Sequence, residues 1–219
     1  MNRLALVLSM MAVAAFAFAQ PVSAALTSVV TDPEGDTFLI LPIPVPAYLD
    51  IVKAEIVAKR QTFTFLMDMA APVPAAPPLA AELGSFATSI WWLWALDTDL
   101  TTFPSNYPFP GWKVPQSGLS EFLVLVFWDR ANFGGVLIDR RPTLTGGAAI
   151  VTPIKFSVSG SEVKGFVAAS AIGAPATFQW AALTFVIWGE SCFPLGPTSN
   201  CVNEPPDRAP DTDFGTFPS

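Results

Sequence analysis

Three segments of this chain are apolar on both faces of the strand that each would form. They cover residues 90–96, 122–128 and 178–188 and are rich in Val, Leu, Phe and Trp. Such strands lie in the middle of a sheet that is covered on both sides, because neither row of side chains tolerates water. Short segments separated by turn residues at fairly regular intervals are typical of antiparallel all-β folds. We therefore expect an antiparallel β-sandwich, with jelly-roll or immunoglobulin-like layers and long proline-rich loops.

Two further pairs of segments predict hairpins. Residues 50–60 and 62–69 alternate apolar and polar side chains on either side of a two-residue turn. A second hairpin is expected between 154–158 and 163–169, which flank the turn sequence Ser-Gly-Ser-Glu. The apolar face of the first hairpin would contain Val52, Ala54, Ile56, Ala58, Phe63, Phe65, Met67 and Met69.

The first 24 residues have the composition of an export signal. Arg3 gives a positive start, residues 4–19 carry no charge, and small residues precede the end of the segment at Ala24. We expect cleavage after Ala24. Cleavage after Ala19 is the alternative position, and a membrane anchor is the alternative role of the segment.

Residues 25–219 would then form one β-sandwich domain, ending in an acidic, proline-rich tail at about 203–219. We expect a secreted protein, extracellular or periplasmic, with no stable membrane span after processing. In such a compartment the closely spaced Cys192 and Cys201 are expected to form a disulfide. The 18 acidic and 11 basic residues give a net charge of −7, so nucleic acid is not an expected partner.

Acidic residues gather at the expected turns and strand ends, and the chain has no histidine. Carboxylates that converge without histidine suit a hard cation, and calcium takes six to eight oxygen ligands from irregular loops. We therefore predict one structural Ca²⁺ site. Its candidate ligands are Asp32, Asp36, Asp97, Asp99, Glu121 and Asp211. The alternative is that each acid is a solvated turn residue, since Asp-Pro-Glu-Gly alone forms a good β-turn.

The order of several motifs resembles an exported β-sandwich superfamily. The motifs are Asp-x-x-Gly-Asp from Asp32, Trp-x-Leu-Asp-Thr-Asp from Trp94, Val-Ala-Ala-Ser-x-Ile-Gly from Val167 and Asp-x-Ala-Pro-Asp from Asp207. This superfamily includes family 9 carbohydrate-binding modules and DOMON-like domains. The resemblance implies calcium bound by loop acids that match Asp36, Asp97, Asp99 and Glu121. It also implies a sugar held between exposed aromatic rings, whereas haem of the kind bound by histidine and methionine is not expected here.

One loop carries candidate stacking residues. Trp112 lies in Phe-Pro-Gly-Trp-Lys, where no strand period requires burial, and Tyr107 and Phe109 are close to it in the sequence. These three aromatic residues are the predicted ligand-binding surface. Packing of the rings within the loop is the alternative.

No catalytic motif is present in the sequence. A Ser-His-Asp triad is impossible without histidine. We therefore expect a calcium-stabilised, non-catalytic binding module whose ligand is a glycan or another cell-surface polymer. A structural or adhesive subunit, forming a homo-oligomer through its apolar strand faces, is the first alternative. The second is a carboxylate-dependent glycoside hydrolase or lyase using Asp97, Asp99 and Glu121.

Overall fold

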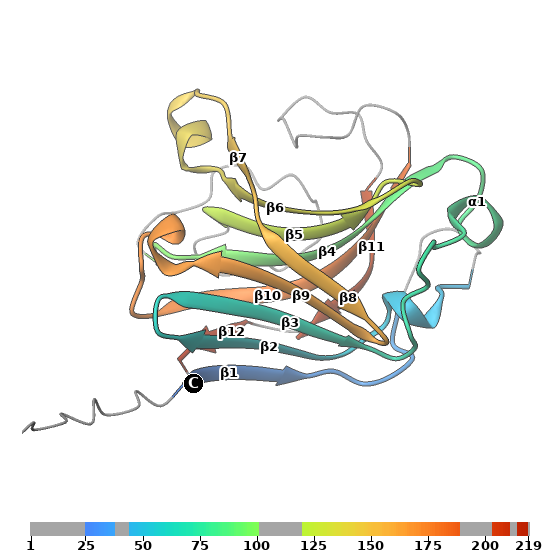
Figure 1. Cartoon of the computed structure of the whole chain (residues 1–219), viewed down its shortest axis with the longest axis horizontal. Coiled ribbons are helices and arrows are strands. Elements are labelled where there is room, and N and C mark those ends of the chain that lie inside the picture. Colours follow the sequence, from blue (N-terminus) through green and yellow to red (C-terminus); the bar gives the residue numbers. More distant parts are fainter. Residues whose placement is uncertain (1–24, 38–43, 101–119, 189–202, 211–213, 219) are drawn as a thin grey trace, which may run out of the picture.

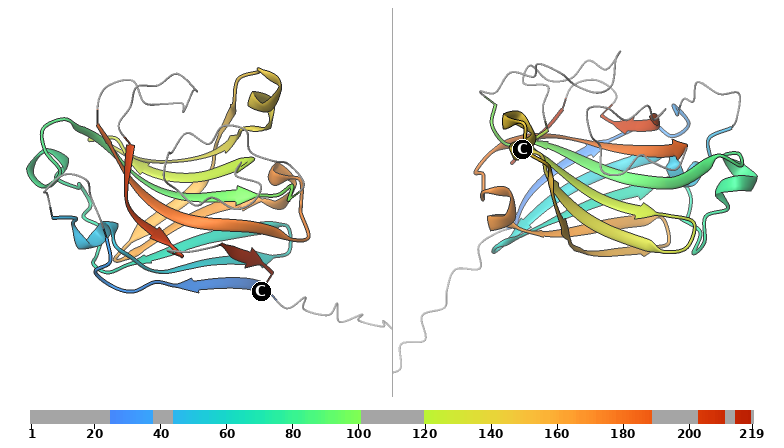
Figure 2. Two further views of the ribbon diagram at one scale, coloured as in Figure 1. Left: turned by 180° about the vertical axis from the view of Figure 1, so that it is seen from behind. Right: turned by 90° about the horizontal axis from the view of Figure 1, so that it is seen from above.

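Two antiparallel sheets pack face to face as a β-sandwich, which confirms the predicted fold class (Figures 1 and 2). This computed structural model describes residues 25–37, 44–100, 120–188, 203–210 and 214–218. The predicted signal segment, the two cysteines, the three loop aromatics and Asp211 lie outside these described residues.

The smaller sheet has five strands in the order β1-β2-β3-β9-β8. The strand bounds are β1 (Leu26–Thr31), β2 (Ile51–Lys59), β3 (Thr62–Met69), β9 (Glu162–Ala168) and β8 (Lys155–Ser159). Both predicted hairpins, β2–β3 and β8–β9, are confirmed. The expected alternation holds from Ala54 onward, but a bulge between Ile51 and Lys53 brings Ile51 into the core and leaves Val52 only half-buried.

The larger sheet has the strand order β11-β10-β4-β5-β6-β7, and β12 also pairs with β10. The strand bounds are β11 (Asn203–Ala209), β10 (Phe178–Trp188), β4 (Ala87–Asp97), β5 (Phe122–Trp128), β6 (Phe133–Asp139), β7 (Ile150–Pro153) and β12 (Gly215–Phe217). The three strands that are apolar on both faces, β4, β5 and β10, lie in the interior of this sheet, as the sequence predicted.

Helical structure is confined to short connections in the described part of the chain. They are α1 (Leu79–Glu82) and the 3₁₀ turns η1 (Ala47–Leu49), η2 (Arg141–Thr145) and η3 (Ala169–Ile172). None of the described helices combines the length and apolarity needed to span a bilayer.

The main core lies between the two sheets and is rich in aromatic rings. Trp92, Trp94 and Trp180 from the larger sheet are fully buried there. Phe65 of the smaller sheet contacts Trp94 with ring centroids 6.0 Å apart. One row of side chains from each central strand therefore belongs to this core.

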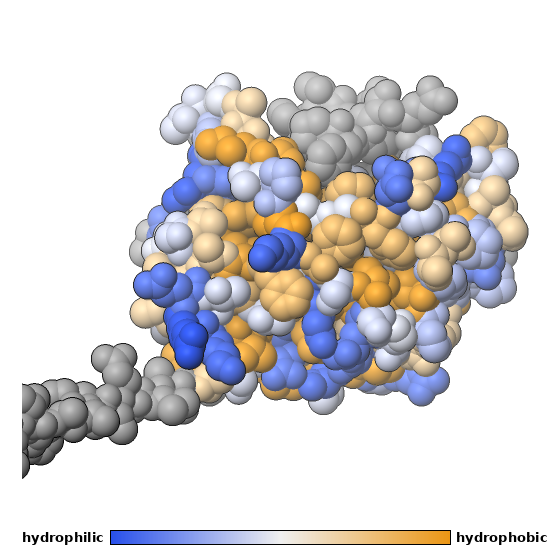
Figure 3. Space-filling model, viewed as in Figure 1, coloured by the Kyte–Doolittle hydropathy of each residue, from blue (hydrophilic) through white to orange (hydrophobic). Residues whose placement is uncertain are grey.

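The outer faces of the two sheets differ in character. The outer face of the larger sheet is a second apolar cluster, in which Leu93, Leu125 and Leu183 are buried by the chain itself. The smaller sheet carries ion pairs on its outer face, Lys53–Glu55 and Lys164–Glu162, each 2.8 Å long. In Figure 3, hydrophilic side chains gather over the part of the molecule where Figure 1 shows the smaller sheet. Only the smaller sheet follows the usual pattern of an apolar inner and a polar outer face.

Two strands lie within the acidic, proline-rich stretch at about 203–219. Residues 203–209 form β11 and residues 215–217 form β12, and both pair with β10. The prolines of β11 are compatible with its position at the sheet edge. Proline has no backbone N–H, and the open side of an edge strand forms no hydrogen bonds with a neighbouring strand. The C-terminal region is therefore part of the sandwich.

Candidate metal centre

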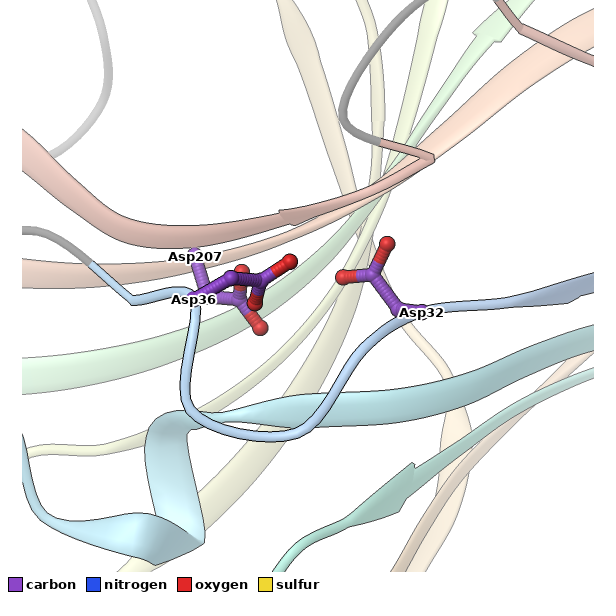
Figure 4. A group of neighbouring side chains, drawn as sticks. All are labelled: Asp32, Asp36 and Asp207. Atoms are coloured by element: carbon purple, nitrogen blue, oxygen red, sulfur yellow. The ribbon is translucent and has the colours of Figure 1, made fainter.

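Three carboxylates from distant parts of the sequence converge beside β11. Asp32 follows β1, Asp36 lies at the other end of the short loop that begins there, and Asp207 lies on β11. One carboxylate oxygen from each residue lies within 4.8 Å of the other two. In Figure 4, Asp32 points across the loop toward Asp36 and Asp207, which lie close together. The arrangement joins the N-terminal loop to the C-terminal strand.

Backbone hydrogen bonds hold the loop and the strand in place. The Asp32 amide donates to the Val52 carbonyl at 3.1 Å, which continues the pairing of β1 with β2. The amide of Ile51, at the start of β2, donates to Oδ2 of Asp207, and the Arg208 amide donates to Oδ1 at 2.7 Å. The β1–β2 pair of one sheet and the edge strand of the other therefore meet at this cluster.

Asp207 lies deep in the protein, with 2% of its surface exposed. Burial is the largest cause that raises the pKa of the Asp207 carboxyl to about 7. The two backbone amides that donate to it oppose this rise, and the charges of Asp36 and Asp50 add to it. Among the described residues, the main groups that shift this pKa include no basic side chain. The site therefore concentrates negative charge in a poorly hydrated place, which favours a bound cation or proton.

The spacing of the three oxygens suits calcium. Calcium–oxygen bonds of about 2.4 Å make the coordination sphere about 4.8 Å across, and calcium accepts irregular geometry. Magnesium requires a stricter octahedron with shorter bonds and usually keeps several waters. Carboxylates without histidine or cysteine also disfavour zinc and copper. The partly buried cluster could thus hold a metal ion, and calcium fits its donor set best.

Other predicted ligands form a second, separate acidic group. Asp97 ends β4, and Glu121 precedes β5 directly, opposite Asp97 in the β4–β5 register. The amides of Thr98 and Asp99 donate to Oε2 of Glu121, at 2.6 and 3.4 Å. Asp97 and Glu121 are 4% and 3% exposed. The two carboxylates are therefore buried side by side on neighbouring strands.

Asp97 has an unusual electrostatic environment. Both of its carboxylate oxygens are buried and accept no hydrogen bond within the described part of the chain. Burial, followed by the charge of Glu121, raises the pKa of Asp97 to about 7. The Asp99 amide opposes this shift, although it makes no hydrogen bond of ordinary geometry with Asp97. Asp97 is therefore costly to ionise in the folded protein.

The two acidic groups lie on opposite faces of the larger sheet. Asp97 continues the outer row of Trp91, Leu93 and Ala95, whereas Asp207 pairs with Thr184, which is fully buried on the inner face. The two acids are also far apart along the sheet. Asp97 pairs with Gln179 and Asp207 pairs with Thr184, and these two residues of β10 are five positions apart, or about 16 Å along a strand. The structure thus brings Asp32 and Asp36 together, and it does not bring Asp97, Asp99 and Glu121 to them.

Asp207 belongs to the cluster, but the predicted ligand set does not contain it. The motif Asp-x-Ala-Pro-Asp contains both Asp207 and Asp211, and only Asp211 was predicted as a ligand. The sequence signal that could have identified Asp207 is its position directly after Pro205 and Pro206. Two adjacent prolines favour an edge strand, which is where Asp207 lies.

No family model matches the chain, and a search of curated proteins finds no significant match. The fold supports the coarse part of the resemblance, an all-β sandwich of two antiparallel sheets.

Proposed function

We propose that this protein is a calcium-stabilised, non-catalytic binding module of the secreted β-sandwich type. The observation that carries the proposal is the convergence of Asp32, Asp36 and Asp207 within 4.8 Å of one another. Calcium bound there links the loop after β1 to β11 and thereby connects the two sheets. Its proposed role is structural, because the ion would join the loop after β1 to β11.

The calcium site is tested by thermal unfolding in 1 mM CaCl₂ and in EDTA. Calcium at 100 times its dissociation constant stabilises the native state by about 2.7 kcal/mol. For a chain of this size, that free energy raises the melting temperature by roughly 5–10 °C. Asp207→Asn should remove the difference, whereas Asp68→Asn, on β3 outside the cluster, should retain it. An equal melting temperature in CaCl₂ and EDTA contradicts the proposal.

The proposed ligand is a glycan or a cell-surface polymer. The support is the family resemblance together with the loop aromatics Tyr107, Phe109 and Trp112, which lie outside the described residues. Retention on insoluble polysaccharides and on a glycan array tests the ligand. Trp112→Ala should abolish retention, with Phe86→Ala as a control, because Phe86 is an exposed aromatic residue of another loop (79% exposed). A wild-type protein that is retained on none of these ligands removes the glycan from the proposal.

A structural or adhesive subunit is the second candidate, and the edge strands favour it. Ile150 and Val151 on β7 are 55% and 38% exposed, and Leu26 and Val29 on β1 are 51% and 45% exposed. Apolar side chains on open edges favour pairing with a further strand. Association into polymers at micromolar concentration would support this candidate, and a monomer would support the binding module.

A further inference from the structure

A fourth carboxylate, that of Asp50, lies beside the proposed calcium site. Asp50 follows the short turn η1, directly precedes β2, and is 5% exposed. The next residue, Ile51, donates its amide to Oδ2 of Asp207, so Asp50 is one residue away from a direct contact with that carboxylate. Asp50 therefore adds negative charge to a site that already contains three acids.

One oxygen of Asp50 positions the loop that carries two of the ligands. The Gly35 amide donates to Oδ2 of Asp50 at 2.9 Å. Gly35 has φ of +87°, a conformation that favours glycine and allows the tight turn between Asp32 and Asp36. The next residue, Ile51, donates its amide to Asp207. The dipeptide Asp50-Ile51 therefore contacts both segments that supply the carboxylates.

The other oxygen of Asp50 has no hydrogen-bond partner among the described residues. Oδ1 is buried and accepts no hydrogen bond from them. A buried carboxylate oxygen without a donor is costly unless a cation or a proton compensates it. The Asp50 side chain is an observation independent of the three carboxylates that define the cluster. Like them, it favours a bound cation.

We propose that Asp50 is the fourth acidic residue of the cation site, with Oδ1 facing the ion and Oδ2 holding the loop. This inference depends on the proposed calcium site. Four carboxylates give the site more negative charge than a divalent ion neutralises. The site should therefore prefer ions of large coordination number and high charge, Ca²⁺ and trivalent lanthanides, over Mg²⁺.

Titration calorimetry with CaCl₂, MgCl₂ and TbCl₃ on the full chain tests the inference. Asp50→Asn should weaken calcium binding by about 10- to 100-fold, as losses around a metal site commonly do. The loss for Tb³⁺ should be the larger, because a trivalent ion interacts more strongly with the deleted charge. Asp68→Asn makes the same change of charge on β3 and should bind calcium like the wild type. A role in loop position alone would weaken binding of both ions by the same factor.

The outcomes separate this inference from the proposed function. One outcome overturns the role of Asp50 and retains the calcium site. In it, Asp207→Asn abolishes calcium binding, whereas the calcium affinity of Asp50→Asn stays within twofold of that of Asp68→Asn. Equal losses for Ca²⁺ and Tb³⁺ also overturn it. A wild-type protein that binds no calcium overturns both proposals.

A measurement on the wild type covers the case in which Asp50→Asn does not fold. In protein labelled with ¹³C at the aspartate carboxyl carbon, the Asp50 resonance should move with that of Asp207 as CaCl₂ is added. An Asp50 resonance that stays in place while that of Asp207 moves overturns the inference.

Discussion

At the scale of single residues, the most consequential group is the Asp207 carboxylate. It is buried at the meeting point of both sheets, and two backbone amides donate to it. The main groups that shift its pKa include no basic side chain of the described residues. Two amides stabilise a carboxylate only partly when other carboxylates lie close by. Without an ion, the protein can lower this cost by binding a proton at Asp207.

The first prediction concerns the pH dependence of the metal-free protein. The pKa of Asp207 rises from an ordinary value of 3.8 to about 7 on folding, so the folded state binds the proton more tightly. The stability associated with this proton is fully present below about pH 4 and is lost as the pH rises through 7. The loss is at most about 4 kcal/mol for a shift of about three pKa units.

Urea unfolding in EDTA between pH 4 and pH 8 measures this effect. Asp207→Asn should flatten the pH profile and make the metal-free protein more stable at pH 8. Calcium should restore the stability of the wild type at pH 8 and have little effect on the variant. A wild-type profile that rises toward pH 8 in EDTA would contradict the assignment.

The second prediction concerns Asp97, whose pKa is also raised to about 7. The sign is the same, so Asp97 costs stability above pH 7 and very little below pH 4. Asp97→Asn should therefore raise the melting temperature at pH 8 more than at pH 5. The matched control is Asp129→Asn in an exposed turn, where the carboxylate accepts the amides of Ala131 and Asn132. A lower melting temperature for Asp97→Asn at pH 8 would show that the charge of Asp97 is compensated.

At the scale of elements, β11 is the strand that depends most on the proposed ion. It is the edge strand of the larger sheet and pairs only with β10 among the described strands. The Asp207 carboxylate links it to the smaller sheet by accepting a hydrogen bond from the Ile51 amide. A cation between Asp207 and the loop after β1 would reinforce this link.

The third prediction is that calcium removal exposes this edge locally. Exchange of the Gly35, Ile51 and Arg208 amides should accelerate in EDTA, by up to about 100-fold relative to calcium at 100 times its dissociation constant. The amide of Leu125, in the centre of the larger sheet, serves as the internal control and should change little. Equal acceleration at all four amides would mean that the ion stabilises the fold globally.

The fourth prediction tests how β12 is seated on β10. A Cβ atom at Gly215 would lie 2.5 Å from Cε2 of the fully buried Trp180. Gly215→Ala should therefore displace β12 and cost about 1–3 kcal/mol of unfolding free energy. The neighbouring Thr216→Ala, at an exposed position, should cost much less. Urea unfolding followed by tryptophan fluorescence measures both, and equal stabilities would show that β12 shifts freely.

At the scale of the whole molecule, both faces of the central strands of the larger sheet, β4, β5 and β10, are buried within one chain. Its outer apolar row, which includes Leu93, Leu125 and Leu183, needs no second copy of the protein to exclude water. Any self-association would then have to use other surfaces, such as the exposed edge strands. This arrangement favours a monomeric module.

The fifth prediction is therefore a monomer of about 23 kDa, or slightly less after removal of a signal segment, in size-exclusion chromatography with light scattering. The result should be the same in CaCl₂ and in EDTA, because the proposed ion lies within one chain. A dimer or polymer that Ile150→Lys and Val151→Lys dissociate would instead support the structural subunit.

Local patterns in the sequence determined the fold class and the strands. The alternation in 50–60 and 62–69 gave the hairpin, and the doubly apolar segments gave the central strands. These signals are short-range, since the side chains of a strand repeat every two residues wherever the strand lies. The sequence also shows several acidic residues at expected turns and contains no histidine. Together these two features indicated a hard cation.

Only the tertiary structure decided which acids meet. Alternation places Asp97 in the row of Trp91, Leu93 and Ala95, but it does not tell which row of β4 faces the other sheet. The packing of the sheets sends that row outward and brings Asp207 inward to Asp32 and Asp36. Asp207 is more than 170 positions from Asp32 and Asp36, so their proximity depends on how the two sheets stack. The sheets stack so that little apolar area is left in water, and local periodicity carries no information about this arrangement.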